Sequence, residues 1–263
     1  MKDTDVTSAA REAGNSTVVE WGARLGYATL GLIHLLIAWI ALKVAWGIGG
    51  GSKSADTSGA LETLSGSGTG VLLLWVCVVG FVLLAVWQLL EAAIGFGEAA
   101  DRAKAVAKGV TYLFFAWTTF KVAQGAGSSA EQQTEDFTAQ LMGSPGGRVL
   151  VGLVGLVVLG IAGYHVYKGW TKKFLEDLRE HPGDWAVHAG RIGYIAKGVA
   201  LVIVGFFFLV AAWQADPEEA QGLDGALKTV KEMAFGPVLL TLVAVGIAAY
   251  GVYSFARARY ARV

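Results

Sequence analysis

Six long stretches without charged residues constrain this chain more than any other feature. A helix that crosses a bilayer needs about 20 apolar residues. Counted between the nearest charged residues, the stretches contain 18, 28, 12, 19, 18 and 24 residues, in the intervals 24–43, 62–91, 108–121, 148–168, 197–216 and 232–257. The short third stretch suffices only if Lys108 and Lys121 extend their alkyl stems towards the headgroups. We therefore predict six transmembrane segments.

The composition agrees with insertion into a membrane. Charged residues make up 16% of the chain, against about 25% in soluble domains. Basic and acidic residues are equal in number, 21 of each, which argues against a nucleic-acid partner because such a partner selects a basic surface. The single cysteine, Cys77, excludes a disulfide scaffold and a cysteine-based zinc site. Backbone groups in lipid must be bonded within their own segment, so we expect an all-α fold.

The distribution of basic residues predicts the orientation of the chain. Six spans leave both chain ends on one side, and that side carries 15 basic residues against 6 on the other. Basic residues are retained in the cytoplasm, so we expect cytoplasmic N- and C-termini. The first 22 residues are polar and lack an early apolar region. We therefore expect no cleavable signal peptide, and insertion directed by the first span.

The chain contains three copies of one pattern. Residues 24–27 read Arg-Leu-Gly-Tyr and residues 191–194 read Arg-Ile-Gly-Tyr, each with a glycine seven residues after the arginine. In the middle copy Arg102 keeps this distance to Gly109, but Lys104 and Ala105 replace the Gly-Tyr pair. The repeated small and aromatic residues of these first helices are Gly26, Tyr27, Gly31, Gly109, Gly193, Tyr194 and Gly198.

The second helix of each copy repeats as well. Gly80, Gly160 and Gly246 each stand 19 residues after a leucine, and bulky residues follow them at plus four and plus seven, among them Tyr164 and Tyr250. The connection GALETL at 59–64 matches GALKTV at 225–230, and both predict a short amphipathic helix at the membrane surface.

These patterns predict three helical hairpins. We place them at 15–95, 96–170 and 180–263, with a disordered cytoplasmic tail at 1–14 and a cytoplasmic connector at 171–179. Each copy has an even number of spans, so all copies insert the same way up. The simplest closed arrangement of such parallel repeats is a ring around a pseudo-threefold axis along the membrane normal.

The repeated motifs resemble those of the bacterial "domain of unknown function 1206" family. The shared features are the Arg-x-Gly-Tyr-x3-Gly opening, the GAL connection and the Gly-x3-Tyr-x2-Tyr second helix. The resemblance covers nearly the whole chain after residue 20 and is weakest in the middle copy. It implies three copies of a two-helix unit and a bacterial plasma membrane. It implies no activity.

The repeated arginines and glycines are candidate functional residues. Arg24, Arg102 and Arg191 stand at equivalent span starts, so a threefold ring would gather them at one depth. They could bind an anion or a lipid headgroup, or they could be topology anchors, which we favour. We interpret the repeated glycines and their neighbouring tyrosines as helix-packing positions. The alternative is a groove for an apolar ligand such as a lipid tail or a quinone.

Polar residues inside the spans are few. His34 and His165 invite a haem hypothesis, but His34 lies about 15 Å deep and His165 lies near a span end, whereas axial ligands need matched depth. We expect no cofactor and no metal, and a hydrogen bond from His34 to a neighbouring helix. Glu91 with Gln88 could pair with a nearby basic residue of the next segment or take part in proton movement.

Two functional classes remain open. No nucleophile, metalloprotease, phosphate-loop or dinucleotide motif occurs, so we expect no enzyme activity. The first class is a structural or accessory protein that binds the bilayer, an anionic phospholipid or another membrane protein. The alternative is a channel or transporter for a small solute or ion along the pseudo-threefold axis. Its polar lining would have to come from His34, Thr111, Thr118, Thr119 and Thr241.

Overall fold

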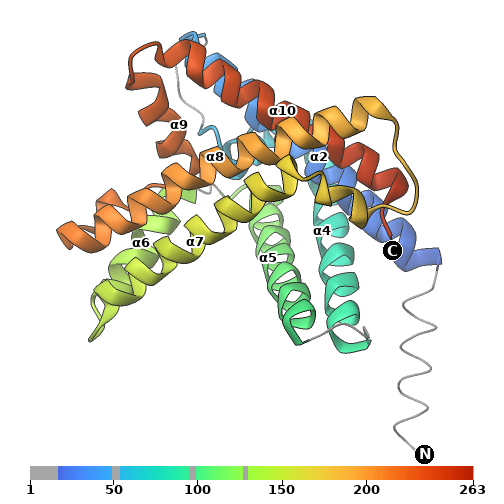
Figure 1. Cartoon of the computed structure of the whole chain (residues 1–263), viewed down its shortest axis with the longest axis horizontal. Helices are drawn as coiled ribbons and strands as arrows, with labels where there is room; N and C mark the ends of the chain where they lie inside the picture. The colour runs from blue at the N-terminus through green and yellow to red at the C-terminus, as the bar shows by residue number, and fades with distance from the viewer. Residues whose placement is uncertain (1–16, 49–53, 95–98, 127–129, 263) are drawn as a thin grey trace, which may run out of the picture.

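The computed structural model describes residues 17–48, 54–94, 99–126 and 130–262 (Figure 1). Within these ranges the chain is helical apart from its connections, and β-structure is limited to one isolated bridge between Leu178 and Ala261. The predicted all-α fold is confirmed. The predicted disordered tail, 1–14, lies outside the described residues.

The long helices follow the apolar stretches, and short helices lie between them. The long ones are α2 (Thr17–Ala45), α4 (Gly68–Ile94), α5 (Ala99–Ala123), α7 (Gly147–Trp170), α8 (Asp184–Gln214) and α10 (Gly236–Tyr260). The short ones are α3 (Thr57–Ser65), α6 (Ala130–Met142), α9 (Leu223–Glu232) and the 3-10 turns η1 (Lys173–Asp177) and η2 (Pro217–Glu219). Five of the long helices, all but α5, are long and apolar enough to cross a membrane. They suggest a multi-pass membrane protein.

The closest helix pairs join different copies of the repeat. α4 packs along α5, α7 along α8, and α10 along α2. Figure 1 shows α7 and α8 running together across the view, steeply inclined to α4 and α5. Inside the first copy α2 also packs on α4, and inside the third α8 packs on α10. Inside the middle copy α5 and α7 have at most marginal contact.

Repeated glycines lie where helices of one copy cross. A Cβ atom at Gly26 would overlap Leu84 and the carbonyl oxygen of Gly80, and a Cβ atom at Gly193 would lie 2.5 Å from the Cα atom of Tyr250. Small residues let helix backbones approach each other, which is the main source of close packing between helices in lipid. The α2–α4 and α8–α10 crossings therefore depend on these glycines.

A second set of glycines lies between copies. Gly31 faces α10, Gly109 faces α4 and Gly198 faces α7. A Cβ atom added at any of the three would lie less than 3.0 Å from an atom of the facing helix. The same position of the first helix thus contacts the second helix of the preceding copy in all three cases. The contact of Gly31 with α10 joins the last copy back to the first.

The middle copy breaks this pattern. Gly160 is the counterpart of Gly80 and Gly246, yet an added Cβ atom there would have no neighbour within 4 Å. The sequence supplies a reason, because Lys104 and Ala105 stand where the other copies have glycine and tyrosine. A lysine at such a crossing prevents close backbone approach. The middle copy therefore lacks the glycine-dependent crossing of the other two copies.

The short helices α3, α6 and α9 occupy equivalent places in the three copies. Each connects the first long helix of a copy to the second, and α9 contacts both α6 and the residue before the cap of α3. α3 and α9 confirm the helices predicted at 59–64 and 225–230. We did not predict α6, although Leu141 within it keeps the repeated 19-residue spacing to Gly160.

A buried aspartate fastens α9 to the start of α3. Asp224 is 1% exposed, its Oδ1 atom accepts a hydrogen bond from the backbone N–H of Ala55 at 2.6 Å, and its Oδ2 atom lies 2.7 Å from Nζ of Lys228. Asp56 then caps α3 by accepting from the N–H of Gly59 at 2.9 Å. Ala55 precedes α3, so its buried N–H has no acceptor within that helix, and the carboxylate of Asp224 supplies one.

We expect Asp224→Ala to lower the free energy of unfolding by about 2 kcal/mol, because the N–H of Ala55 is left buried and unpaired. Thermal unfolding of the purified protein in mild detergent measures the loss. The control is Lys228→Ala, which removes the 52% exposed partner and is expected to cost less than about 1 kcal/mol. Equal losses in the two variants would contradict a role for the backbone hydrogen bond.

Candidate functional site

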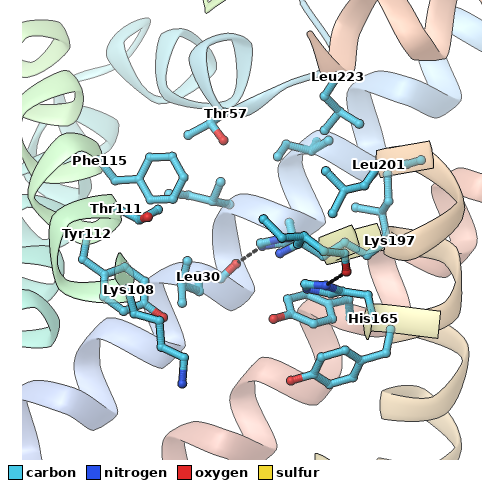
Figure 2. Close-up of a pocket in the computed structure, with 18 of the residues that line it drawn as sticks. Leu30, Thr57, Lys108, Thr111, Tyr112, Phe115, His165, Lys197, Leu201 and Leu223 are labelled. Atoms are coloured by element: carbon cyan, nitrogen blue, oxygen red, sulfur yellow. Dashed lines mark hydrogen bonds between the residues drawn. The ribbon is translucent and has the colours of Figure 1, made fainter. Parts of the chain in front are cut away.

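A cavity of about 520 Å³ lies where α5 and α7 fail to meet. All six long helices contribute to its lining. Figure 2 shows side chains of α5 on one side of the cavity and side chains of α7 and α8 on the other, with Thr57 of α3 and Leu223 of α9 at one end. Ile161 and Tyr164 line the cavity and are 45% and 47% exposed. The cavity is therefore open to the side, between α5 and α7.

One part of the lining is apolar. It is formed by Leu30, Ile33, Ile37, Phe115, Leu201 and Ile247. These side chains come from α2, α5, α8 and α10, so the apolar wall depends on the assembly of all three copies. The volume of the whole cavity falls within the range of about 300–1,000 Å³ that is typical of ligand pockets.

The other part of the lining is basic. Lys108, Lys168, Lys197 and Arg257 line the cavity together with one carboxylate, Asp177. Nζ of Lys168 lies 2.7 Å from Oδ2 of Asp177, and the guanidinium of Arg257 lies 3.8 Å from the same oxygen. Lys108 and Lys197 form no ion pair within the described part of the chain. Four cations against one carboxylate give the cavity a net positive charge, which attracts anions.

Tyrosines of the repeated motif support these cations. Nη2 of Arg257 donates a hydrogen bond to the hydroxyl of Tyr27 at 3.1 Å. Nζ of Lys197 lies 4.4 Å from the ring centre of Tyr250, and Nζ of Lys168 lies 5.4 Å from that of Tyr194. A cation over an aromatic face is stabilised by the ring quadrupole. Tyrosines that we interpreted as packing residues also position the charged side chains of the cavity.

The two histidines come to the same cavity. His34 and His165 both line it, although counting residues from the ends of their spans predicted different depths in the membrane. Depth counted along the sequence assumes parallel helices, and the long helices here are steeply inclined to one another (Figure 1). The expected hydrogen bond from His34 to a neighbouring helix is wrong, because its Nδ1 atom donates to the carbonyl of Leu30 in α2 at 2.7 Å. Its contact with a neighbour is a ring contact, 4.7 Å from Tyr250.

The three repeated arginines lie outside the cavity. Arg24 pairs with Glu20 at 2.7 Å, Arg191 lies 5.3 Å over the ring of Trp170, and Arg102 is exposed. None of the three contributes to the cavity lining. The structure therefore separates these arginines from the basic part of the cavity.

The other polar candidates are scattered. Gln88 is 3% exposed within the bundle, whereas Glu91 is exposed. Thr111 lines the cavity, while Thr118 and Thr119 are buried elsewhere. Sequence reasoning placed no site at Lys108, Lys168, Lys197 or Arg257. The available signal was Lys108 itself, which shortens the third apolar stretch to 12 residues and so needs a polar environment within the span.

The threefold pattern of helices and glycine contacts is what a triplicated two-helix unit would produce. A sequence profile described as Domain of Unknown Function (DUF1206) matches residues 25–95, 103–172 and 192–261. The chain belongs to the DUF1206 family. The three matches fit the three-copy repeat, and the profile covers the long helices that surround the cavity.

A curated relative supports this assignment. It is an uncharacterized protein of Bacillus subtilis (strain 168), YxxB, 29% identical over 251 residues, which cover 90% of this chain and 89% of the relative. No solved structure matches the chain significantly. The DUF1206 family name carries no activity, so a function has to be argued from the cavity itself.

Proposed function

We propose that this DUF1206 protein is a non-enzymatic protein of the bacterial plasma membrane that binds an anionic lipid in the cavity between α5 and α7. The observation that carries the proposal is the joining of an apolar wall to four cations in one laterally open cavity. An anionic phospholipid has the matching structure, since its acyl chains need an apolar surface and its phosphate needs cations.

The proposal includes α5 as a sixth span. α5 packs along α4, and its Lys108 lines the cavity. Charged side chains inside membrane helices usually face a cavity or the bundle interior, where a partner offsets the cost of burial. A lipid phosphate would be such a partner for Lys108. The six spans would then form a ring of three hairpins around a pseudo-threefold axis, open between α5 and α7.

The proposed orientation places the basic part of the cavity in the cytoplasmic leaflet. Arg257 lies in the last turn of α10 and the carbonyl of Asp177 accepts a hydrogen bond from the N–H of Arg262, so both lie at the end of the bundle where α10 ends. The excess of basic residues on that side supports a cytoplasmic location. Anionic lipids give the cytoplasmic leaflet its negative surface potential, so the ligand is abundant where the cations lie.

The permeation alternative has less support. Of the residues proposed to line a path, only His34 and Thr111 reach the cavity. Thr57 and Leu223, from α3 and α9, line one end of the cavity, and Lys108 lies towards the opposite end (Figure 2). A hydrated path would need a polar lining along its length. A binding cavity that opens sideways fits these positions better.

Native mass spectrometry of the protein purified in mild detergent tests the proposal. We expect the wild type to retain an anionic phospholipid, and the double variant Lys108→Gln, Lys197→Gln to retain at least about tenfold less, because each lost charge-assisted hydrogen bond weakens binding by about 1.5–3 kcal/mol. The matched control is Arg24→Gln, Arg191→Gln, which removes the same charge outside the cavity and should leave retention unchanged.

Two results would contradict the proposal. The first is equal loss of lipid in the lysine and arginine variants, which would indicate a general effect of positive charge. The second is a wild type that retains a partner protein and no lipid. Size-exclusion profiles and thermal unfolding of each variant distinguish lost binding from lost folding.

A further inference from the structure

We infer that the cavity selects an anionic lipid whose headgroup carries free hydroxyl groups, such as a phosphoglycerol headgroup, through the Nε2 atoms of His34 and His165. This inference rests on the proposed function and adds the chemical class of the headgroup. It uses two side chains that a simple attraction between lysines and phosphate does not need.

The hydrogen bonds of the histidines fix the tautomer of each neutral ring. Nδ1 of His34 lies 2.7 Å from the carbonyl oxygen of Leu30, and Nδ1 of His165 lies 2.9 Å from that of Ile161. A carbonyl oxygen only accepts, so Nδ1 carries a proton in both rings, and in the neutral imidazole, which the neighbouring cations of the cavity favour, Nε2 keeps its lone pair. Within the described part of the chain neither ring makes another hydrogen bond. Each histidine therefore offers the cavity one unused acceptor.

The two acceptors belong to one continuous row of rings. The ring centres of His34 and Tyr250 are 4.7 Å apart, those of Tyr250 and Tyr194 are 5.2 Å apart, and those of Tyr194 and His165 are 5.7 Å apart. Both tyrosines are buried, so they hold the histidines in place. Nζ of Lys197 lies 4.4 Å from the ring centre of Tyr250, and Figure 2 shows Lys197 beside His165.

This row complements the donors and acceptors of a phosphoglycerol headgroup. Lys197 offers a cation for the phosphodiester, and the imidazoles at the two ends of the row offer acceptors for hydroxyl groups. Ethanolamine and choline headgroups would bring an ammonium group to a cavity that already holds four cations and one carboxylate. A phosphodiester without hydroxyl groups would leave both Nε2 atoms unpaired, and a site built to bind a hydroxyl rejects an analogue that lacks it.

The test compares two lipids of equal charge. The protein is incorporated into nanodiscs that contain equal amounts of phosphatidylglycerol and phosphatidylethanol with the same acyl chains, and native mass spectrometry measures the ratio retained after release into mild detergent. Both lipids are monoanionic phosphodiesters, and only the first has free hydroxyl groups. We expect the wild type to favour phosphatidylglycerol about tenfold, as two hydrogen bonds of ordinary strength would give.

Variants assign this preference to the histidines. In His34→Phe, His165→Phe the rings remain and the acceptors disappear, so we expect the ratio to fall to about one while the total anionic lipid stays near the wild-type amount. In His34→Gln, His165→Gln the side-chain carbonyl can still accept, so we expect part of the preference to return. A preference that survives unchanged in the phenylalanine variant would overturn the inference.

The outcomes separate the inference from the proposed function. Equal retention of both lipids by the wild type would overturn the hydroxyl selection and leave lipid binding standing. Retention of neither lipid would overturn the proposed function and this inference with it. An excess of soluble glycerol 3-phosphate is expected to leave the bound lipid in place, and its displacement would show that the site takes a free phosphate ester instead of a lipid.

Discussion

Leucine in place of Gly246 is expected to lower the free energy of unfolding by about 3 kcal/mol, the upper part of the usual range for overpacking. A Cβ atom at this position would overlap the side chain of Ala196 in α8, so α8 and α10 would have to separate. Such a separation also displaces Tyr250, which lies one turn further along α10 and forms part of the cavity wall.

The repeat provides a matched control for this substitution. Gly160 holds the same repeat position in α7, where an added side chain would meet open space. We expect Gly160→Leu to change the free energy of unfolding by less than about 1 kcal/mol, since it combines a gain in helix propensity with no clash. Thermal unfolding of both variants in one detergent measures the difference. Equal destabilisation of the two would contradict the separation of α5 from α7.

The sequence was sufficient for the long helices and for α3 and α9 because their signals are local, whereas α6 and the two 3-10 turns were not predicted. Apolar length placed the long helices, and the shared GAL connection placed α3 and α9. The Gly-Tyr pair of the third copy, Gly193 and Tyr194, predicted close helix packing. In the structure the backbone at Gly193 lies directly against Tyr250. These inferences needed only periodicity and spacing.

The cavity could not be predicted in the same way, because it depends on how helices are inclined. The absence of the Gly-Tyr pair from the middle copy was visible in the sequence, but the resulting gap between α5 and α7 was not. Lys104 weakens one crossing, and only the packing of the other helices decides whether the gap closes or stays open. His34 and His165 illustrate the difficulty, since their unequal sequence depths concealed a shared cavity.

The repeated arginines and the cations that line the cavity are different residues. Arg24, Arg102 and Arg191 repeat, which made them the natural candidates for a shared anion site. Two of the cations that line the cavity also repeat, since Lys108 and Lys197 each stand immediately before the repeated glycine, where the first copy has Leu30. The cavity lies where α5 and α7 do not pack on each other, and its cations come from α5, α7, α8 and α10. The lysine before the repeated glycine was therefore a signal visible in the sequence, and the emphasis on the repeated arginines left it unused.

Tryptophan in place of Leu201 is expected to reduce the retained anionic lipid by more than about tenfold, since it fills the site while leaving every cation in place. Leu201 lines the apolar part of the cavity on α8 (Figure 2), where an indole ring would occupy the space proposed for an acyl chain. A loss of about 1.4 kcal/mol in binding free energy already gives a tenfold change. Native mass spectrometry of lipid retained in mild detergent measures the effect.

The control for this variant lies one residue further along the same helix. Val202 is 45% exposed and does not line the cavity, so Val202→Trp adds the same indole ring to the outer surface of α8. We expect it to retain lipid as the wild type does. If Leu201→Trp binds as much lipid as Val202→Trp, the acyl chain does not enter the cavity, and the cations alone would have to account for any lipid that remains bound.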